Sequence, residues 1–493
     1  MSNSKQEYKQ ILKATSLFGG VQVFNILIVI VRSKVIAILL GPTGMGIAGM
    51  FNSTIRMIGM LTNFGLGISA VKDIAEAHRT SDEVKISKIV AVFRKLVWGT
   101  GLLGAIVTLI LSPWLSQLTF GNNQYTLGFI WLSVTLLFKQ LTSSQNVLLQ
   151  GMRKLRYLAE ANIISATLGL VVSFPIYYYW RLDGIVPALL ITSFITLFVA
   201  IFYARKIQIQ KVSVSNKEIL IDGKSMLKMG FMLSLSGFIT LGASYIVRIY
   251  ISNTGGLNDV GLYTAGFSII GTYVGLIFSA MGTDYYPRLS AVTNDETKTN
   301  NLINQQAEIG ILIIAPILTV FLIFINWIII GFYSSKFVPI NGMIHWAALG
   351  MYFKSVSWAI GFILLAKGAS KLFFWSELIS NVYMLLFNIL GYKYGGLNGL
   401  GISFFISYIL VLLQVYFIAY YNFNFKLKKE LIKLFVQQFI LGLMCFLIIE
   451  LIDGYLVYFI GLIFIVISGR ISYIELDKKI NLKEIFINLK NRQ

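Results

Sequence analysis

The most regular feature of the chain is a succession of long apolar segments separated by short polar ones. Fourteen such segments follow one another, and most have the length of about 20 residues that a helix needs to cross a membrane. We therefore predict fourteen membrane-spanning helices and no large soluble domain. The predicted spans are residues 12–40, 44–71, 88–111, 125–150, 156–180, 184–204, 228–252, 257–285, 305–331, 340–366, 371–394, 397–421, 431–450 and 454–469.

The composition supports this pattern. The 493 residues are 56% hydrophobic and 13% charged, with a mean hydropathy of +0.75, whereas about a quarter of the residues in a soluble domain are charged. We therefore predict an all-α integral membrane protein. One cysteine, Cys445, and two histidines that are far apart in the sequence argue against metal or thiol chemistry. The chain also lacks a GxxxxGK[ST] motif, so we expect no ATP hydrolysis and no cofactor.

The charges are unevenly distributed along the chain. The formal net charge is +20, and basic residues of membrane proteins are retained on cytoplasmic loops. With a cytoplasmic N-terminus, only Arg181, Lys336 and Lys393 of the 41 Lys and Arg residues lie on the outer side. This asymmetry predicts a multi-pass protein with both termini in the cytoplasm. It also explains the positive charge without a nucleic-acid partner.

The chain repeats itself at an offset of 215 to 217 residues. The matched positions include Gly44 with Gly261, Ala48 with Ala265, Arg32 with Arg248, Lys139 with Lys354 and Glu160 with Glu377. Six spans per copy give both copies the same orientation, so we predict two six-helix bundles related by a parallel repeat. The predicted parts are a lobe at residues 1–205, a basic cytoplasmic linker at 206–227, a lobe at 228–421, and two extra helices with a cytoplasmic tail at 422–493.

Six basic residues lie inside predicted spans, where a charge costs roughly 2.5 to 3.5 kcal/mol. Five of them lie on helix faces with other polar or small residues, whereas Lys34 points nearly opposite to Arg32 and is expected to reach the headgroups. They line a cavity or pair between helices; the acidic residues lie in loops or near helix ends, which favours the cavity. The candidate binding residues are Arg32, Arg56, Lys139, Arg248, Lys354, Asn25, Asn52, Asn63 and Asn146.

A cavity with several cations, amides and hydroxyls suits an anion that is rich in hydroxyl groups, such as a diphosphate joined to sugar. Three carboxylates, Glu160, Glu377 and Asp284, are candidates for ion coupling or for a structural role. The structural role is favoured for Glu160 and Glu377, because each lies near the cytoplasmic start of its helix. A stripe of small residues on span 257–285, which includes Ser279 and Gly282, predicts close helix packing or the thin wall of a lateral opening.

The stretch LLGPTGMGIAGMF at residues 39–51, followed by TIRMIGMLTNFGLGISAVK, resembles the Wzx-type O-antigen and lipid-linked oligosaccharide flippases. Their superfamily also holds the multidrug and toxic compound extruders and the lipid II flippases. The resemblance implies two lobes that open alternately and move an undecaprenyl-diphosphate-linked oligosaccharide to the outer leaflet of the bacterial plasma (inner) membrane. It further implies membrane lipids, a glycan polymerase and assembly proteins as partners, and coupling to an unidentified ion, H⁺ or Na⁺.

Three alternatives remain at this point. A lipid II flippase would use the same cationic chemistry. A cation-coupled multidrug exporter would favour acidic residues in its cavity, and the first two spans have none before Asp73. An enzyme such as a polysaccharide polymerase or ligase would need a sizeable external loop for its catalytic residues, whereas the predicted external loops are short. We therefore expect a transporter and no catalytic residues.

Overall fold

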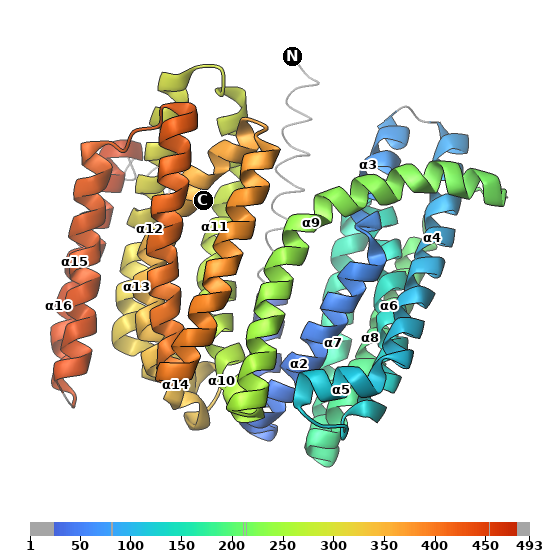
Figure 1. The fold of residues 1–493 in the computed structure, drawn as a ribbon, viewed down its shortest axis with the longest axis horizontal. Coiled ribbons are helices and arrows are strands. Elements are labelled where there is room, and N and C mark those ends of the chain that lie inside the picture. Colours follow the sequence, from blue (N-terminus) through green and yellow to red (C-terminus); the bar gives the residue numbers. More distant parts are fainter. Residues whose placement is uncertain (1–23, 80–81, 211, 213, 453, 481–493) are drawn as a thin grey trace, which may run out of the picture. The chain divides into compact units, whose positions relative to one another are not determined.

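The computed structural model describes residues 24–79, 82–210, 212, 214–452 and 454–480, and within these ranges all regular secondary structure is helical (Figure 1). The protein is an all-α membrane protein, as its sequence predicts. A first helix covers residues 24–39. It is followed by α2 (Gly41–Asn63), α3 (Leu66–Arg79), α4 (Glu83–Ile110), α5 (Ser112–Phe120), α6 (Thr126–Gly151), α7 (Leu155–Trp180), η1 (Arg181–Gly184), α8 (Ile185–Ala204), α9 (Asn216–Thr254), α10 (Leu257–Ser268), η2 (Ile269–Val274), α11 (Gly275–Ala291), α12 (Glu296–Phe332), η3 (Ser335–Ile340), α13 (Asn341–Ala366), α14 (Ser370–Phe423), α15 (Lys429–Leu451) and α16 (Leu456–Ile480).

Every predicted span overlaps a helix, and residues 12–23 of the first span lie outside the described residues. By length and composition, seven helical segments of the described chain are apolar enough to cross a membrane, or eight if the bent pair α2 and α3 is one span. Two of these segments, Leu155–Ala204 and Ser370–Phe423, each hold two predicted spans. In the second of them the helix direction changes at Gly396, which has a φ of 54°.

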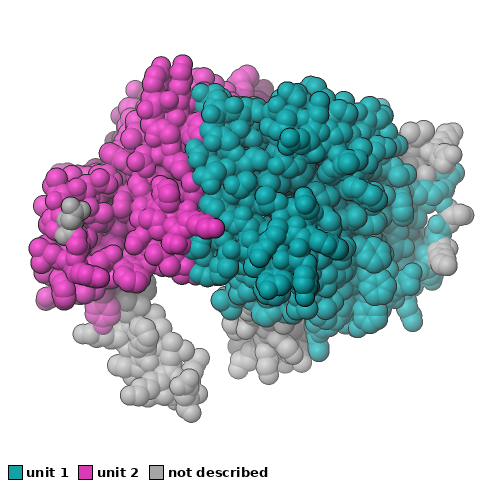
Figure 2. Space-filling view, turned by 90° about the horizontal axis from the view of Figure 1, so that it is seen from below, with its two compact units in different colours: residues 1–261, 332–334 teal, residues 262–331, 335–493 magenta. Residues whose placement is uncertain are grey.

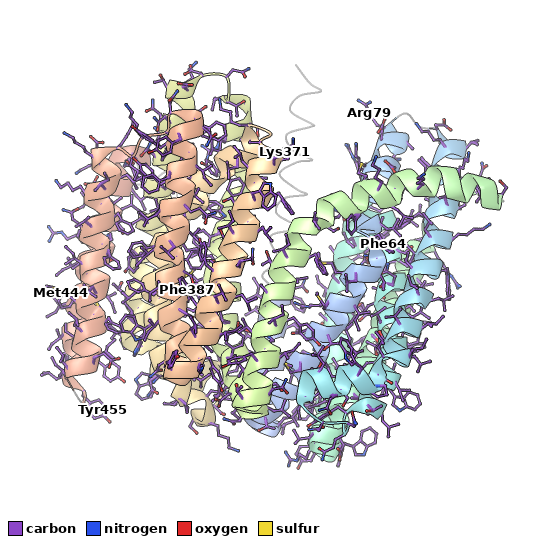
Figure 3. All side chains as sticks on the ribbon, in the orientation of Figure 1. Phe64, Arg79, Lys371, Phe387, Met444 and Tyr455 are labelled. Atoms are coloured by element: carbon purple, nitrogen blue, oxygen red, sulfur yellow. The ribbon has the colours of Figure 1, made fainter. Side chains whose placement is uncertain are left out.

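Two local features differ from the predicted spans. Span 44–71 is broken into α2 and α3, whose axes differ by 54°. The break lies at Phe64, which is labelled in Figure 3, and at Gly65, whose φ values are 50° and 64°. A side chain at Gly65 would lie 2.1 Å from the carbonyl oxygen of Gly230, so this bend depends on a glycine. The short helix α5 is the other difference: it has a proline in its first turn and ends at Phe120, with Gly121 as its C-cap.

The chain forms two compact units, coloured separately in Figure 2. Unit 1 consists of residues 1–261 and 332–334, and unit 2 of residues 262–331 and 335–493. Helix α9 starts at Asn216, so part of the predicted linker is helical, and it packs against α2, α3, α4 and α5 within unit 1. The lobe boundaries that the sequence suggests, at residues 205, 227 and 421, stay a prediction.

The core of unit 1 lies between α3, α4, α6 and α8, and its members include Leu66, Ile74, Phe93 and Leu148. Helix α9 is joined to this unit by the buried hydroxyl of Tyr245. That oxygen lies 2.8 Å from Thr54 Oγ1 on α2 and 2.8 Å from Thr119 Oγ1 on α5. The outer surface carries many exposed apolar side chains, which is what a lipid-facing helix requires.

Helices α2 and α10 approach one another closely, because the two residues at their contact are glycines and have no side chains. A Cβ atom at Gly46 would lie 2.0 Å from the Leu257 carbonyl oxygen, and one at Gly261 would lie 1.8 Å from the Pro42 carbonyl oxygen. Small residues permit such close approach of membrane helices, where lipid provides no hydrophobic driving force. Gly261 therefore contacts, within unit 1, the segment that contains its repeat partner Gly44.

Unit 2 is organised around α13, which packs against α14, α11 and α15. Polar groups join its last two helices to the rest of the unit. The Gln438 amide on α15 donates to the Ser468 carbonyl oxygen and to Ser472 Oγ on α16. The Lys479 ammonium on α16 forms an ion pair with Glu308, whose side chain is buried on α12. Buried polar groups need such partners, so α15 and α16 have fixed places in this unit.

The glycine contact predicts a position-specific effect on stability. In Gly261→Ala the new methyl group overlaps the α2 backbone, so we expect a loss of at least about 1 to 3 kcal/mol in the free energy of unfolding. Gly59→Ala is the control, because nothing lies within 4 Å of its added Cβ, and alanine favours a helix by roughly 0.5 to 1 kcal/mol over glycine. Thermal unfolding in detergent measures both. Equal unfolding midpoints for the two variants would contradict the prediction.

Candidate functional site

Unit 1 contains a cavity of about 600 Å³ that the first helix, α2, α6, α7 and α8 enclose. Cavities of this size accommodate a small ligand or part of a larger one. Its polar and charged lining residues are Asn25, Arg32, Asn52, Lys139, Thr142, Asn162, Ser165, Tyr177, Thr192, Ser193 and Thr196.

Two basic side chains project into this cavity from different helices. Lys139 on α6 donates a hydrogen bond from Nζ to Oδ1 of Asn52 on α2, over 3.4 Å. Arg32 on the first helix forms a side-chain hydrogen bond with the hydroxyl of Tyr177 on α7. An ammonium and a guanidinium carry three and five N–H groups, so both retain donors for a ligand.

A third cation, Arg56, lies one turn beyond Asn52 on α2 with an exposed side chain, and it is not among the lining residues. The charges of Arg56 and Arg32 both act on Lys139. No Asp or Glu is among the described residues that line the cavity. Like charges gathered without a carboxylate repel one another, so an anionic ligand would be stabilised here.

The lining of α7 and α8 was not among the sequence candidates. It consists of one amide and several hydroxyls, from Asn162, Ser165, Thr192, Ser193 and Thr196. Their i, i+3 and i, i+4 spacings within two apolar spans are the signal that could have found them, but the candidate amides all lie on spans that also contain a basic residue. Thr192 and Thr196 donate to the backbone carbonyl oxygens four residues before them, over 2.7 Å each. Their oxygens can still accept hydrogen bonds, for example from sugar hydroxyls.

The structure brings four of the nine predicted binding residues together in this cavity: Asn25, Arg32, Asn52 and Lys139. Of the others, Asn63 lies beside the break between α2 and α3, and Asn146 has a buried Oδ1 without a hydrogen-bond partner. Arg248 on α9 donates to the Ser244 carbonyl oxygen over 3.2 Å and to its Oγ over 2.5 Å. Lys354 belongs to unit 2.

The three candidate coupling carboxylates have different surroundings. Glu160 forms an ion pair with Arg156 over 2.8 Å, and Asp284 forms one with Arg288 over 2.8 Å. Glu377 is half-buried on α14, and its carbonyl oxygen accepts a hydrogen bond from Asn381. Within the described part of the chain, no three His, Cys, Asp or Glu residues come together as a metal site.

The sequence matches a family model described as "Polysaccharide biosynthesis protein" over residues 11–293. Two curated relatives, from Escherichia coli (strain K12) and Shigella flexneri, are each named lipid III flippase. Each is 25% identical to this chain over 363 residues, which cover 72% of this chain and 85% of the relative.

Among solved structures, the lipid II flippase MurJ in an inward closed conformation is similar to this fold, with a TM-score of 0.67 at 15% identity over 93% of this chain and 99% of that one. An inward-facing multidrug resistance transporter of the MATE family has a TM-score of 0.70 at 16% identity over 81% of this chain and 94% of that one. Relatives and neighbours alike are named flippases or transporters, in agreement with the expectation of a transporter and not an enzyme.

The polar cavity predicts a specific pattern of chemical labelling. A cysteine at Asn162 would face the cavity, and water there would allow the reactive thiolate to form. We expect Asn162→Cys to react with an anionic methanethiosulfonate reagent at least about tenfold faster than Phe198→Cys, because the cations attract the reagent. Phe198 is a demanding control, since its side chain is 65% exposed but on an apolar surface.

Purified protein in lipid nanodiscs and mass spectrometry of the labelled chain provide the measurement. The native Cys445 is 0% exposed and contributes no background. Labelling of Phe198→Cys at the same rate as Asn162→Cys would show that the cavity is not a hydrated anion-attracting site.

Proposed function

Since the chain belongs to the polysaccharide biosynthesis protein family, we propose that it is a flippase that moves an undecaprenyl-diphosphate-linked oligosaccharide from the cytoplasmic to the outer leaflet of the plasma membrane. The observation that supports this proposal best is the cavity of unit 1. It combines Arg32 and Lys139 with amides and hydroxyls, and no carboxylate is among its described lining residues. A lipid-linked oligosaccharide presents the matching groups, namely phosphates and sugar hydroxyls.

The physical problem in this reaction is the transfer of a charged, hydrated headgroup through hydrocarbon. An isolated ion loses its hydration there without replacement, at a cost of tens of kcal/mol. In the proposed step, Arg32 and Lys139 bind phosphate oxygens through charge-assisted hydrogen bonds. Asn52, Asn162 and the hydroxyls of α7 and α8 replace water around the sugars. Alternate opening of the cavity to the two sides of the membrane then completes transport.

The substrate class within this family is the finer part of the proposal. The curated relatives are named lipid III flippases and the structural neighbour is named a lipid II flippase, so the flipping of a lipid is common to these names. We propose an O-antigen-type repeat unit as the cargo, with lipid II as the alternative. Coupling to H⁺ or Na⁺ also belongs to the proposal, and no residue is assigned to the ion.

The structural similarity to a multidrug transporter suggests a different cargo, but the charge of the cavity disfavours it. Organic cations bind where a carboxylate or aromatic face compensates their charge. The described lining instead carries two positive side chains, which would repel such a substrate. An anionic cargo therefore fits this site better than a cationic one.

The proposal predicts that removal of either cavity charge impairs export. A hydrogen bond to a charged group contributes about 1.5 to 3 kcal/mol, so we expect Arg32→Gln or Lys139→Gln to slow export by about 10- to 100-fold. Glutamine keeps a polar side chain of similar length and lowers the risk of misfolding. The measurement is the amount of glycan that reaches the cell surface in a strain that depends on this protein.

Lys34→Gln is the matched control, because Lys34 lies on the same helix as Arg32 but is not a lining residue of the cavity. Its export should remain within about twofold of the unmodified protein, because its ammonium is not part of the cavity lining. Normal export by Arg32→Gln and Lys139→Gln at normal protein levels would refute the proposed role of the cavity. The glycan that accumulates inside cells of a deletion strain would separate an O-antigen-type unit from lipid II.

A further inference from the structure

The basic residues Lys139 and Lys354, which match in the sequence repeat, have opposite surroundings. Lys139 lies among amides and hydroxyls in unit 1. The Lys354 ammonium in unit 2 lies 5.1 Å from the ring centre of Tyr408, 5.9 Å from that of Phe278 and 5.9 Å from that of Phe404. These distances are within the range of cation–π attraction. The ammonium is therefore held at the edge of an aromatic region.

An apolar groove of about 470 Å³ starts beside this ammonium, between α11 and α13. Its lining residues are Phe278, Ser279, Gly282, Tyr286, Trp358, Phe362 and Leu365. The ring of Phe278 is common to both features, since it contacts Lys354 and lines the groove. A ligand in the groove would thus be apolar along its length, with a positive charge available at one end.

The walls of this groove are rigid aromatic rings. The ring centre of Trp358 lies 5.3 Å from that of Phe278 and 5.0 Å from that of Phe362. Beneath them, the fully buried Tyr285 contacts Trp358 and Phe362 at 5.8 Å and 5.4 Å, and its hydroxyl donates to the Ala359 carbonyl oxygen over 2.8 Å. Because this hydroxyl holds Tyr285 in place beneath the rings, the groove is preformed in the absence of a ligand.

The opening of the groove depends on the small residues of α11. A Cβ atom at Gly282 would lie 3.3 Å from Trp358 and 3.6 Å from Phe362, so any larger side chain there would project against the rings. Ser279, one turn earlier, is exposed. The small-residue stripe that the sequence showed on this span therefore borders the groove at these two positions, and at Gly282 it lets α11 lie close to the rings of α13.

We propose that this groove binds the isoprenoid chain of a polyprenyl phosphate, with Lys354 at the phosphate end; the inference rests on the proposed function, because it assigns the apolar part of the same cargo. A single cation beside an apolar groove complements an anion joined to a hydrocarbon chain. An isoprenoid chain is methyl-branched and rich in double bonds, so it is broader than a straight acyl chain and fills an aromatic-walled groove more completely.

The test is equilibrium binding of a long-chain polyprenyl monophosphate with a photoreactive diazirine to the purified full-length protein in nanodiscs. We expect cross-links to peptides of α11 and α13. Gly282→Leu should weaken binding at least about tenfold, because the leucine occupies the space of the chain. Lys354→Gln should weaken binding of the phosphate about tenfold while it leaves binding of the uncharged polyprenol within twofold.

Matched controls separate filling of the groove from damage to the fold. Gly331→Leu introduces the same side chain in unit 2 at an exposed glycine with nothing within 4 Å, and it should bind as the unmodified protein does. Ser279→Leu is a second groove-filling variant in case Gly282→Leu is unstable, and thermal unfolding checks each protein. A straight-chain alkyl phosphate distinguishes an isoprenoid site from a general lipid site.

The inference is overturned if Gly282→Leu or Ser279→Leu, when folded, binds polyprenyl phosphate as Gly331→Leu does. It is also overturned if alkyl and polyprenyl phosphates bind equally, or if Lys354→Gln weakens polyprenol and polyprenyl phosphate to the same extent. These results do not depend on export. Loss of binding in the groove variants together with normal export by Arg32→Gln and Lys139→Gln would uphold the groove and refute the headgroup cavity, and the reverse pattern would do the opposite.

Discussion

A charge inside hydrocarbon must be compensated by the protein or by what the protein binds, and this constraint governs how unit 1 is built. Arg32 and Lys139 come from separate helices and meet at a cavity whose described lining supplies amides and hydroxyls but no carboxylate. Partial compensation by Asn52 and Tyr177 holds the two cations in place. The remaining positive potential is directed into the cavity, so the site favours an anion before any ligand is present.

Placement of α2, the helix that carries Asn52 and Arg56, depends on backbone contacts that only small residues permit. At Gly46 and Gly261 helices α2 and α10 touch through their backbones, and at Gly65 and Gly230 the bend of α2 into α3 fits against α9. Lipid provides no hydrophobic driving force for helix association, so close packing and buried hydrogen bonds must stabilise the contacts between helices. The Tyr245 hydroxyl forms such hydrogen bonds with Thr54 and Thr119. They fix α9 to α2, the helix that carries Asn52 and Arg56.

Much of this arrangement could be predicted from the sequence, because apolar length and helical periodicity are local properties. The spans and the polar helix faces that carry Arg32, Asn52 and Lys139 followed from them. Other features depend on contacts between distant residues. The bend at Gly65 requires Gly230, and the packing of α9 within unit 1 requires Thr54 and Thr119. The hydroxyls of α7 and α8 were visible in the local sequence, but these two spans contain no basic residue at depth that pointed to them. The sequence indicated the small residues of α11, but the groove beside them depends on rings from α13.

The matched lysines of the two repeats have different surroundings, and the chemistry of an amphipathic ligand gives a physical reason for this difference. A symmetric pair of units would offer equal surroundings to both parts of a ligand, which suits a ligand of uniform chemistry. A lipid-linked saccharide has a strongly hydrated part and an apolar part, and no single environment satisfies both, since burying unpaired polar groups costs as much as apolar burial gains. The repeat retains a lysine at the matched positions, but Lys139 faces Asn52 and hydroxyls whereas Lys354 faces Phe278, Phe404 and Tyr408. The repeated charge would recognise a phosphate in each unit, and the different neighbours would determine whether hydrated or apolar groups are accepted beside it.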